Sequence, residues 1–182
     1  MTSYPVGRYW AAAPAGARFK FAPLPSGILL ATPFTLAENL SLTAIELAKF
    51  GPVEQQGTVK VAIHAAVNGL PSGAPILAED VRVPQNGRAV WFAPTGSPVA
   101  IEAGSYFAVT LTSGALTLRA IDGDSQEIES ILGRSSISDP HPVSALVLPA
   151  TAVTSLPLTF TGSEAWEDWQ ASAGAPVAYL AS

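Results

Sequence analysis

Two residues of the chain could act as a general base near neutral pH, His64 and His141. Nucleophilic catalysis needs such a base within hydrogen-bond reach of a nucleophile and of a group that orients it. The chain has no Gly-x-Ser-x-Gly sequence, which would place a serine on a sharp turn, and it has no cysteine. His64 falls in an expected strand and His141 between two prolines, so we interpret both as ordinary surface or edge histidines.

Paired carboxylates are the second arrangement that could support catalysis, because glycoside hydrolysis needs two of them facing each other across a cleft. Glu127 and Glu129 are two residues apart, which places them on one face of a strand rather than opposed. A second acidic group accompanies two tryptophans and consists of Glu164, Glu167 and Asp168. We interpret both groups as solvated charge and expect no enzymatic activity.

Oxygen ligands for a metal ion are concentrated in one short segment. Asp122, Asp124 and Ser125, together with Glu127, supply oxygens at alternating positions, which suits calcium. The segment lacks the full EF-hand pattern, and an Asp-Gly pair is also typical of a turn between two strands. We therefore expect no cofactor, with calcium at Asp122 and Asp124 as the weaker alternative.

Aromatic residues could bind a sugar, because a planar ring stacks on the apolar face of a pyranose. Trp166 and Trp169 lie three residues apart in an acidic stretch, with Gln170 next to them. These three residues are the candidate glycan site, and packing beneath a loop is the alternative interpretation. Trp91 lies between Val90 and Phe92 in an expected strand, so we assign it to the core.

The first 27 residues differ in composition from the rest. Proline and glycine at this density oppose a regular helix or a central strand, whereas the interleaved aromatic residues oppose simple disorder. We expect an extended arm that packs either on its own domain or on a partner. The candidate docking residues are Tyr4, Arg8, Tyr9, Trp10, Phe19 and Phe21, since Tyr and Trp dominate interface hot spots.

Composition limits the class of protein. The chain of 182 residues is long enough for one domain, and its hydrophobic fraction of 48% can fill a core. Charged residues make up only 13%, which suits a surface partly covered by neighbouring subunits. The net charge of −5, with basic residues scattered singly, argues against nucleic acid as a partner.

The sequence contains no recognisable targeting or membrane segment. Residues 1–10 lack the basic and apolar regions of a signal peptide, and the longest apolar runs are too short to span a bilayer. We therefore expect synthesis in the cytoplasm without a signal peptide, and no membrane insertion.

Alternating apolar and polar residues bounded by Gly and Pro predict half-buried antiparallel strands. The clearest examples are 58–64, 88–93 and 104–112, with Gly69 to Gly73 as a break after the first. Residues 39–50 fit a strand with a slip at Thr43-Ala44 better than a helix. Further short strands are expected at 28–35, 115–120, 128–132, 144–148, 156–161 and 176–180, with a loop or turn at 166–169.

The order of these landmarks resembles the jelly-roll domains of phage and phage-like particle proteins. The resemblance covers roughly residues 7–112 and rests on the following segments: Gly7-Arg8-Tyr9-Trp10, Pro33-Phe34, the strands 42–47 and 59–64, Gly69-Leu70-Pro71-Ser72-Gly73, Ile76-Leu77, Trp91-Phe92 and Ile101-Glu102-Ala103-Gly104-Ser105-Tyr106-Phe107. His64 and Phe107 stand where such strands often carry Tyr and Trp. Carbohydrate-binding modules share many of these signals through architecture alone. The resemblance implies a fibre, spike, tail or decoration protein of a virion that could reach host glycans.

Together these observations predict an all-β protein, an antiparallel two-sheet β-sandwich of jelly-roll type. We expect an attachment arm over residues 1–27 and the sandwich over residues 28–182. The expected function is that of a non-enzymatic virion accessory protein, and the alternative is a carbohydrate-binding module that is not tied to a particle. Because particles are built from symmetric copies, we expect a homo-oligomer, with a trimer favoured over a pentamer, in contact with other virion proteins.

Overall fold

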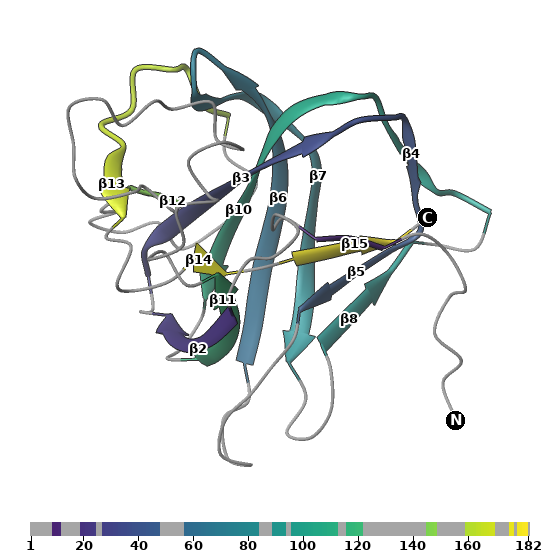
Figure 1. The fold of residues 1–182 in the computed structure, drawn as a ribbon, viewed down its shortest axis with the longest axis horizontal. Coiled ribbons are helices and arrows are strands. Elements are labelled where there is room, and N and C mark those ends of the chain that lie inside the picture. The colour runs from purple at the N-terminus through teal and green to yellow at the C-terminus, as the bar shows by residue number, and fades with distance from the viewer. Residues whose placement is uncertain are drawn as a thin grey trace.

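The computed structural model describes a little under three fifths of the chain, all of it without helix (Figure 1). The described residues are 9–11, 19–24, 27–47, 57–83, 89–93, 96–112, 116–121, 145–148, 159–169, 175–176 and 178–181. Every strand pair among them is antiparallel. The all-β class predicted from the alternating pattern is therefore confirmed.

The largest sheet has six strands in the order β13-β12-β3-β10-β6-β7. Their bounds are β13 (Glu167–Trp169), β12 (Ala145–Leu148), β3 (Leu29–Leu36), β10 (Gly104–Thr112), β6 (Gly57–Val67) and β7 (Leu70–Val83). Figure 1 shows β3, β10, β6 and β7 side by side through the middle of the molecule. His64, Gly73 and Phe107 all lie in this sheet.

The other strands form three smaller sheets. A four-stranded sheet has the order β1-β15-β5-β8, from β1 (Tyr9–Ala11), β15 (Ala178–Ala181), β5 (Ala44–Leu47) and β8 (Ala89–Phe92). A three-stranded sheet contains β14 (Ala175–Pro176), β11 (Leu116–Ile121) and β2 (Phe19–Leu24). The last sheet pairs β4 (Leu40–Leu42) with β9 (Val99–Ile101).

One face of the six-stranded sheet shares a core with the four-stranded sheet. Ile45, Leu47 and Leu180 of the four-stranded sheet belong to the same buried cluster as Leu30, Val61 and other side chains of the six-stranded sheet. We call this cluster the first core. Its residues from the central strands alternate along the chain, because successive side chains of a strand point to opposite faces.

The opposite face of the six-stranded sheet is buried as well. The second core consists of Leu29, Ala31, Ala62, Phe107, Val109, Leu111, Leu146 and Phe160. Every residue of β10 from Tyr106 to Thr112 is therefore buried, although neighbouring residues face different cores. This double burial explains why β10 carries apolar residues on both of its faces.

The β6–β7 hairpin turns earlier and more tightly than expected. The sequence predicted a break from Gly69 to Gly73, but β7 already begins at Leu70. The turn uses only Asn68 and Gly69, whose φ angles are 53° and 76°. Two consecutive positive φ angles are typical of the type I′ turn, which suits an Asn-Gly pair and matches the twist of the strands.

Residues 40–47 form strands, as predicted, but the irregularity at Thr43 is a change of sheet. β4 ends at Leu42 and pairs with β9, whereas β5 begins at Ala44 and pairs with β8 and β15. The carbonyl of Thr43 accepts a hydrogen bond of 2.8 Å from the N–H of Ala93. The chain therefore passes between sheets at the position where the alternation slips.

Two parts of the segment expected to be an arm are paired with the body. Tyr9 and Trp10 in β1 lie opposite Ala181 and Leu180 of β15, and β2 pairs with β11 from Phe19 to Leu24. The expected boundary at residue 27 therefore does not coincide with a break in sheet pairing. Tyr4 and Arg8 lie outside the described residues.

Candidate functional site

The most unusual side-chain arrangement among the described residues lies on the second core, where residues 159–169 cover the six-stranded sheet. We call these residues the covering segment. At one end Phe160 pairs with Gly73 of β7, and at the other end β13 pairs with β12. Figure 1 shows this yellow segment passing beside the ends of β6 and β7 before it enters β13. The sequence predicted a loop at 166–169, and residues 167–169 instead extend the sheet.

The main chain of Gly73 can pair with the covering segment because β7 has a bulge at this position. Ile63 lies opposite Leu77 and Ala65 opposite Ser72, so four residues of β7 correspond to the single residue His64. The bulge frees the main chain of Gly73 from the β6 ladder. The Gly73 N–H donates a hydrogen bond of 2.9 Å to the Phe160 carbonyl, and the Phe160 N–H donates one of 3.1 Å to the Gly73 carbonyl.

His64 lies beneath this contact and is fully buried, with a relative exposure of 0%. Its Nδ1 is 3.2 Å from the carbonyl oxygen of Gly73, and its ring centroid is 4.6 Å from that of Phe160. A carbonyl can only accept, so this hydrogen bond requires the proton on Nδ1. Nε2 is buried and has no hydrogen-bond partner among the described residues.

Burial lowers the pKa of His64 below its ordinary value, although hydrogen bonds to the main chain of Gly73 and Ser72 act in the opposite direction. The imidazole is therefore held in its neutral form. The expectation of a surface or edge histidine was wrong for His64. β6 lies between β10 and β7, and its even-numbered residues Ala62 and Ala66 belong with the second core.

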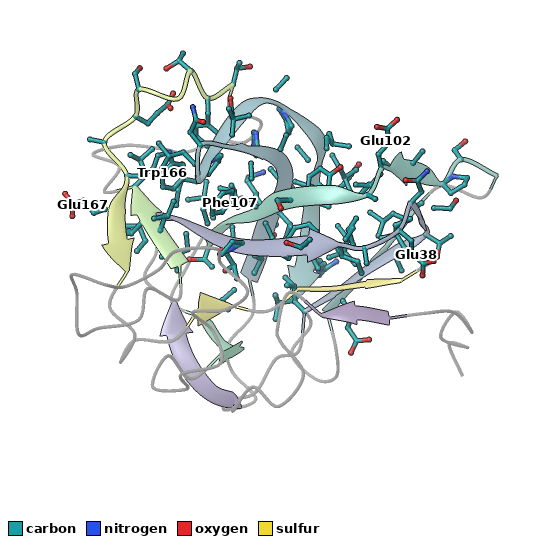
Figure 2. All side chains as sticks on the ribbon, turned by 45° about the horizontal axis from the view of Figure 1, so that its top comes forward. Glu38, Glu102, Phe107, Trp166 and Glu167 are labelled. Atoms are coloured by element: carbon teal, nitrogen blue, oxygen red, sulfur yellow. The ribbon has the colours of Figure 1, made fainter. Side chains whose placement is uncertain are left out.

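Trp166 lies in the covering segment and forms a cluster with His64, Gly73 and Phe160. Its ring meets Phe160 edge to face, with centroids 5.2 Å apart and an interplanar angle of 68°. The side chain is half-buried, and its indole Nε1 is buried without a hydrogen-bond partner among the described residues. Figure 2 shows Trp166 on the same side of the sheet as Phe107. This placement corresponds to the packing interpretation of Trp166.

A compact turn holds the covering segment between Phe160 and Trp166. One carboxylate oxygen of Glu164 accepts hydrogen bonds from the N–H of Thr161 at 2.6 Å and from its hydroxyl at 3.0 Å. The other accepts from the N–H of Gly162 at 2.9 Å. Partial burial acts to raise the pKa of Glu164, but these hydrogen bonds outweigh it, and the pKa lies below its ordinary value.

Three further candidates, Glu167, Asp168 and Trp169, make up β13. Trp169 lies in β13 opposite Ala145, and Glu167 is exposed, on the outer side of β13 in Figure 2. Outside the described residues lie Gln170, the calcium candidates Asp122 and Asp124, the pair Glu127 and Glu129, and His141. Within the described part of the chain, no three His, Asp or Glu side chains are grouped so that they could hold a metal ion.

The far end of the sheet is polar and independent of the cluster. The Tyr106 hydroxyl donates to the Glu102 carbonyl at 2.8 Å, and its ring stacks on Phe34 with centroids 5.7 Å apart. Asn39 accepts a hydrogen bond of 2.8 Å from the N–H of Ala103. Figure 2 places Glu38 and Glu102 at this end, away from Trp166. These contacts fix the connection between β9 and β10.

Comparison with known proteins gives no family assignment: no protein-family model matches the chain, and no similar sequence is found among the curated proteins. Among the described residues, no helix is long and apolar enough to cross a membrane.

Chemically, the cluster can bind and release a proton. His64 has no exposure to water, and its ring lies against the Gly73 carbonyl and the Phe160 ring. Sequence reasoning missed both His64 and Phe160 as partners. One signal was present for His64, because the small residues Ala62 and Ala66 flank it at the positions that share its face, as expected where another segment packs closely.

Proposed function

We propose that this chain is a non-enzymatic accessory protein of a virus or phage-like particle, a fibre, spike, tail or decoration component. In this proposal the six-stranded and four-stranded sheets are the two layers of a jelly-roll β-sandwich. The observation that carries it is the first core, to which both sheets contribute buried side chains, with an aromatic N-terminal strand at the margin of the smaller sheet. The low charged fraction of 13% suits a subunit with large contacts to its neighbours.

The position of β1 supports a specific way of docking. Among the described strands, β1 pairs only with β15 and stands at the end of its sheet. An edge strand can accept a further strand from a partner through main-chain hydrogen bonds. Docking would then use Tyr9 and Trp10 as part of a sheet edge, rather than as part of a detached arm.

Light scattering coupled to size exclusion tests this proposal. The full chain should elute as a homo-oligomer, with a trimer expected first, and Tyr9→Ser should dissociate it without changing the circular dichroism spectrum. Val67→Ser is the matched control, because Val67 is apolar and 51% exposed at the distant hairpin. A monomeric wild type, or dissociation by Val67→Ser alone, would contradict docking through β1.

Glycan binding is the second candidate function, favoured by exposed polar side chains that lie close to Trp166 in the sequence. Thr161, Ser163 and Glu167 are all exposed on or beside the turn. Trp169→Ala should abolish binding on a glycan array, whereas Trp166→Phe should retain it because the packing against Phe160 survives. An array on which the wild type gives no signal removes this candidate.

A further inference from the structure

The cluster on the second core combines a buried titratable group with the only described main-chain pairing between β7 and the covering segment. The carbonyl oxygen of Gly73 accepts two hydrogen bonds, one from His64 Nδ1 at 3.2 Å and one from the Phe160 N–H at 3.1 Å. A carbonyl has two lone pairs, so both bonds can form together. His64 therefore supports the same atom that holds the covering segment.

We propose that His64 is a proton-sensitive switch that keeps the covering segment on the second core while neutral and releases it when protonated. This inference is independent of the proposed function, because it concerns the opening of one segment and not the partner that the protein meets.

The proton step follows from the surroundings of Nε2. The neutral ring already donates through Nδ1, so the added proton goes to the lone pair of Nε2. The resulting imidazolium would carry a second N–H that has no acceptor among the described residues, inside a cluster lined by Phe160 and Phe107. Burying an unpaired charge is costly, so the charged ring must reach water. Phe160 covers it, and the covering segment has to move.

Charged groups on the surrounding elements do not compensate the imidazolium in this arrangement. On β6 and β7, Lys60 and Asp80 pair with each other at 2.6 Å. On the covering segment, the Glu164 carboxylate accepts three hydrogen bonds from its own turn, and Glu167 is exposed. On β10, the residue opposite His64 is Phe107. Among these groups, Glu164 lies on the same segment as Phe160, so Glu164→Gln is included in the test.

The direction of the pH dependence is fixed by the lowered pKa of His64. Above pH 6.5, its ordinary pKa, both closed and open states are neutral and closure is unaffected. As the pH falls below that value, the open state takes up a proton before the closed state does, so closure weakens until the pH reaches the lower pKa of the closed state. At about pH 5.5 the open population should exceed that at about pH 7.5 by up to about tenfold, the limit set by the ordinary pKa of the open state.

Hydrogen exchange followed by mass spectrometry tests the switch in the full chain. After correction for intrinsic exchange, peptides spanning residues 159–166 should exchange faster at about pH 5.5 than at about pH 7.5, by up to about tenfold. Peptides from β3 and β10 should keep their protection. His64→Gln should remove the pH dependence, and His141→Gln, which removes the other histidine of the chain, should leave it unchanged. Glu164→Gln should also retain the pH effect.

Several outcomes would overturn the proposal: unchanged exchange of 159–166, a uniform loss of protection over the whole sheet, or a pH effect that His64→Gln retains. Loss of the effect in Glu164→Gln would assign it to the carboxylate. Should His64→Gln fail to fold, the imidazole NMR titration of His141→Gln decides instead, because His64 is then the only histidine. A pKa below 6.5 supports the switch, and a pKa at or above that value contradicts it.

Discussion

At the scale of residues, one carbonyl oxygen joins the β6–β7 hairpin to the covering segment, which is distant in sequence. Gly73 accepts hydrogen bonds from His64 and from the N–H of Phe160, and Phe160 separates the imidazole from Trp166. Each member has a distinct physical role: Gly73 provides an unusual backbone conformation, His64 a buried donor, and Phe160 an apolar cover. Substitutions of Gly73 and of Phe160 separate the backbone contribution to the stability of the covering segment from the apolar contribution.

Gly73→Ala should loosen the covering segment. Its φ of 72° lies in the left-handed region, which an alanine adopts at a cost of about 1–2 kcal/mol, while no atom lies within 4 Å of an added Cβ. The matched control is Gly96→Ala, whose φ is 80° and whose Cβ also meets no atom. Both variants should lose similar stability in urea, but only Gly73→Ala should speed exchange at residues 159–166. Equal exchange in the two variants would contradict the role given to Gly73.

Phe160→Ala should destabilise the second core by about 3–5 kcal/mol, because a buried phenyl ring is removed from between two other rings. Its 3% exposure leaves little room for water to compensate. Chemical denaturation measures the loss, and acrylamide quenching of tryptophan fluorescence should increase as Trp166 loses its contact. Val67→Ala, at an exposed site, should change stability by less than about 0.5 kcal/mol. A loss of the same small size for Phe160→Ala would show that the ring is not packed.

The chemistry of the residues at this site could be read from the sequence, but their burial could not. His64 was visible as an unusual residue in a strand, yet its burial depends on Phe160, which lies almost a hundred positions later. A single strand pattern shows which residues share a face but not what covers that face. For Trp166, the packing alternative was available from the sequence, and only the contact with Phe160 distinguishes it from an exposed platform.

At the scale of elements, local signals were reliable where a turn or an alternation determines the structure. The strands β6 and β10 follow from period-2 alternation, and Asn68-Gly69 carries a strong hairpin signal that marks the turn more accurately than the run to Gly73. The four-residue bulge of β7 has no such signal, because it depends on the pairing of Gly73 with Phe160. The division of residues 40–47 between two sheets likewise depends on partners distant in sequence.

The turn of the covering segment should depend on Glu164 and on acidity. The pKa of Glu164 is lowered, so the turn is fully stabilised above the ordinary glutamate value of 4.5 and loses that stabilisation as the pH falls through the lower, folded value. Exchange at Thr161 and Gly162, followed by NMR, should therefore accelerate further below pH 4.5 in the wild type. Glu164→Gln should exchange faster at neutral pH and lose this further acceleration, while it keeps the change between about pH 7.5 and about pH 5.5 that belongs to His64. An unchanged acid response in the variant would assign it to another carboxylate.

At the scale of the whole molecule, the six-stranded sheet is buried on both faces by different partners. The four-stranded sheet contributes to the first core, and the covering segment contributes Phe160 to the second. The all-β class followed from the sequence because strands such as β6 and β10 carry their own alternating pattern. The separation of the chain into an arm and a body at residue 27 did not correspond to the sheet pairing, because β1 and β2 join strands near residues 180 and 118.

Deleting residues 1–11 should destabilise the protein, because it removes β1 and exposes the main-chain edge of β15. Deletion of residues 1–8 is the matched control, since it leaves β1 in place. The thermal midpoint should fall for the longer deletion relative to the shorter one, and its tendency to aggregate should rise. Identical midpoints would show that β1 adds nothing to the four-stranded sheet in solution.

Native-state hydrogen exchange at neutral pH, measured over a series of low urea concentrations, tests the two-core organisation most directly. The account predicts two levels of opening free energy. Amides of β3, β10 and β6 should exchange only through global unfolding, with a strong dependence on urea, whereas residues 160–166 should open at a lower free energy with a weak dependence on urea. A single opening free energy and one urea dependence for both regions would contradict it.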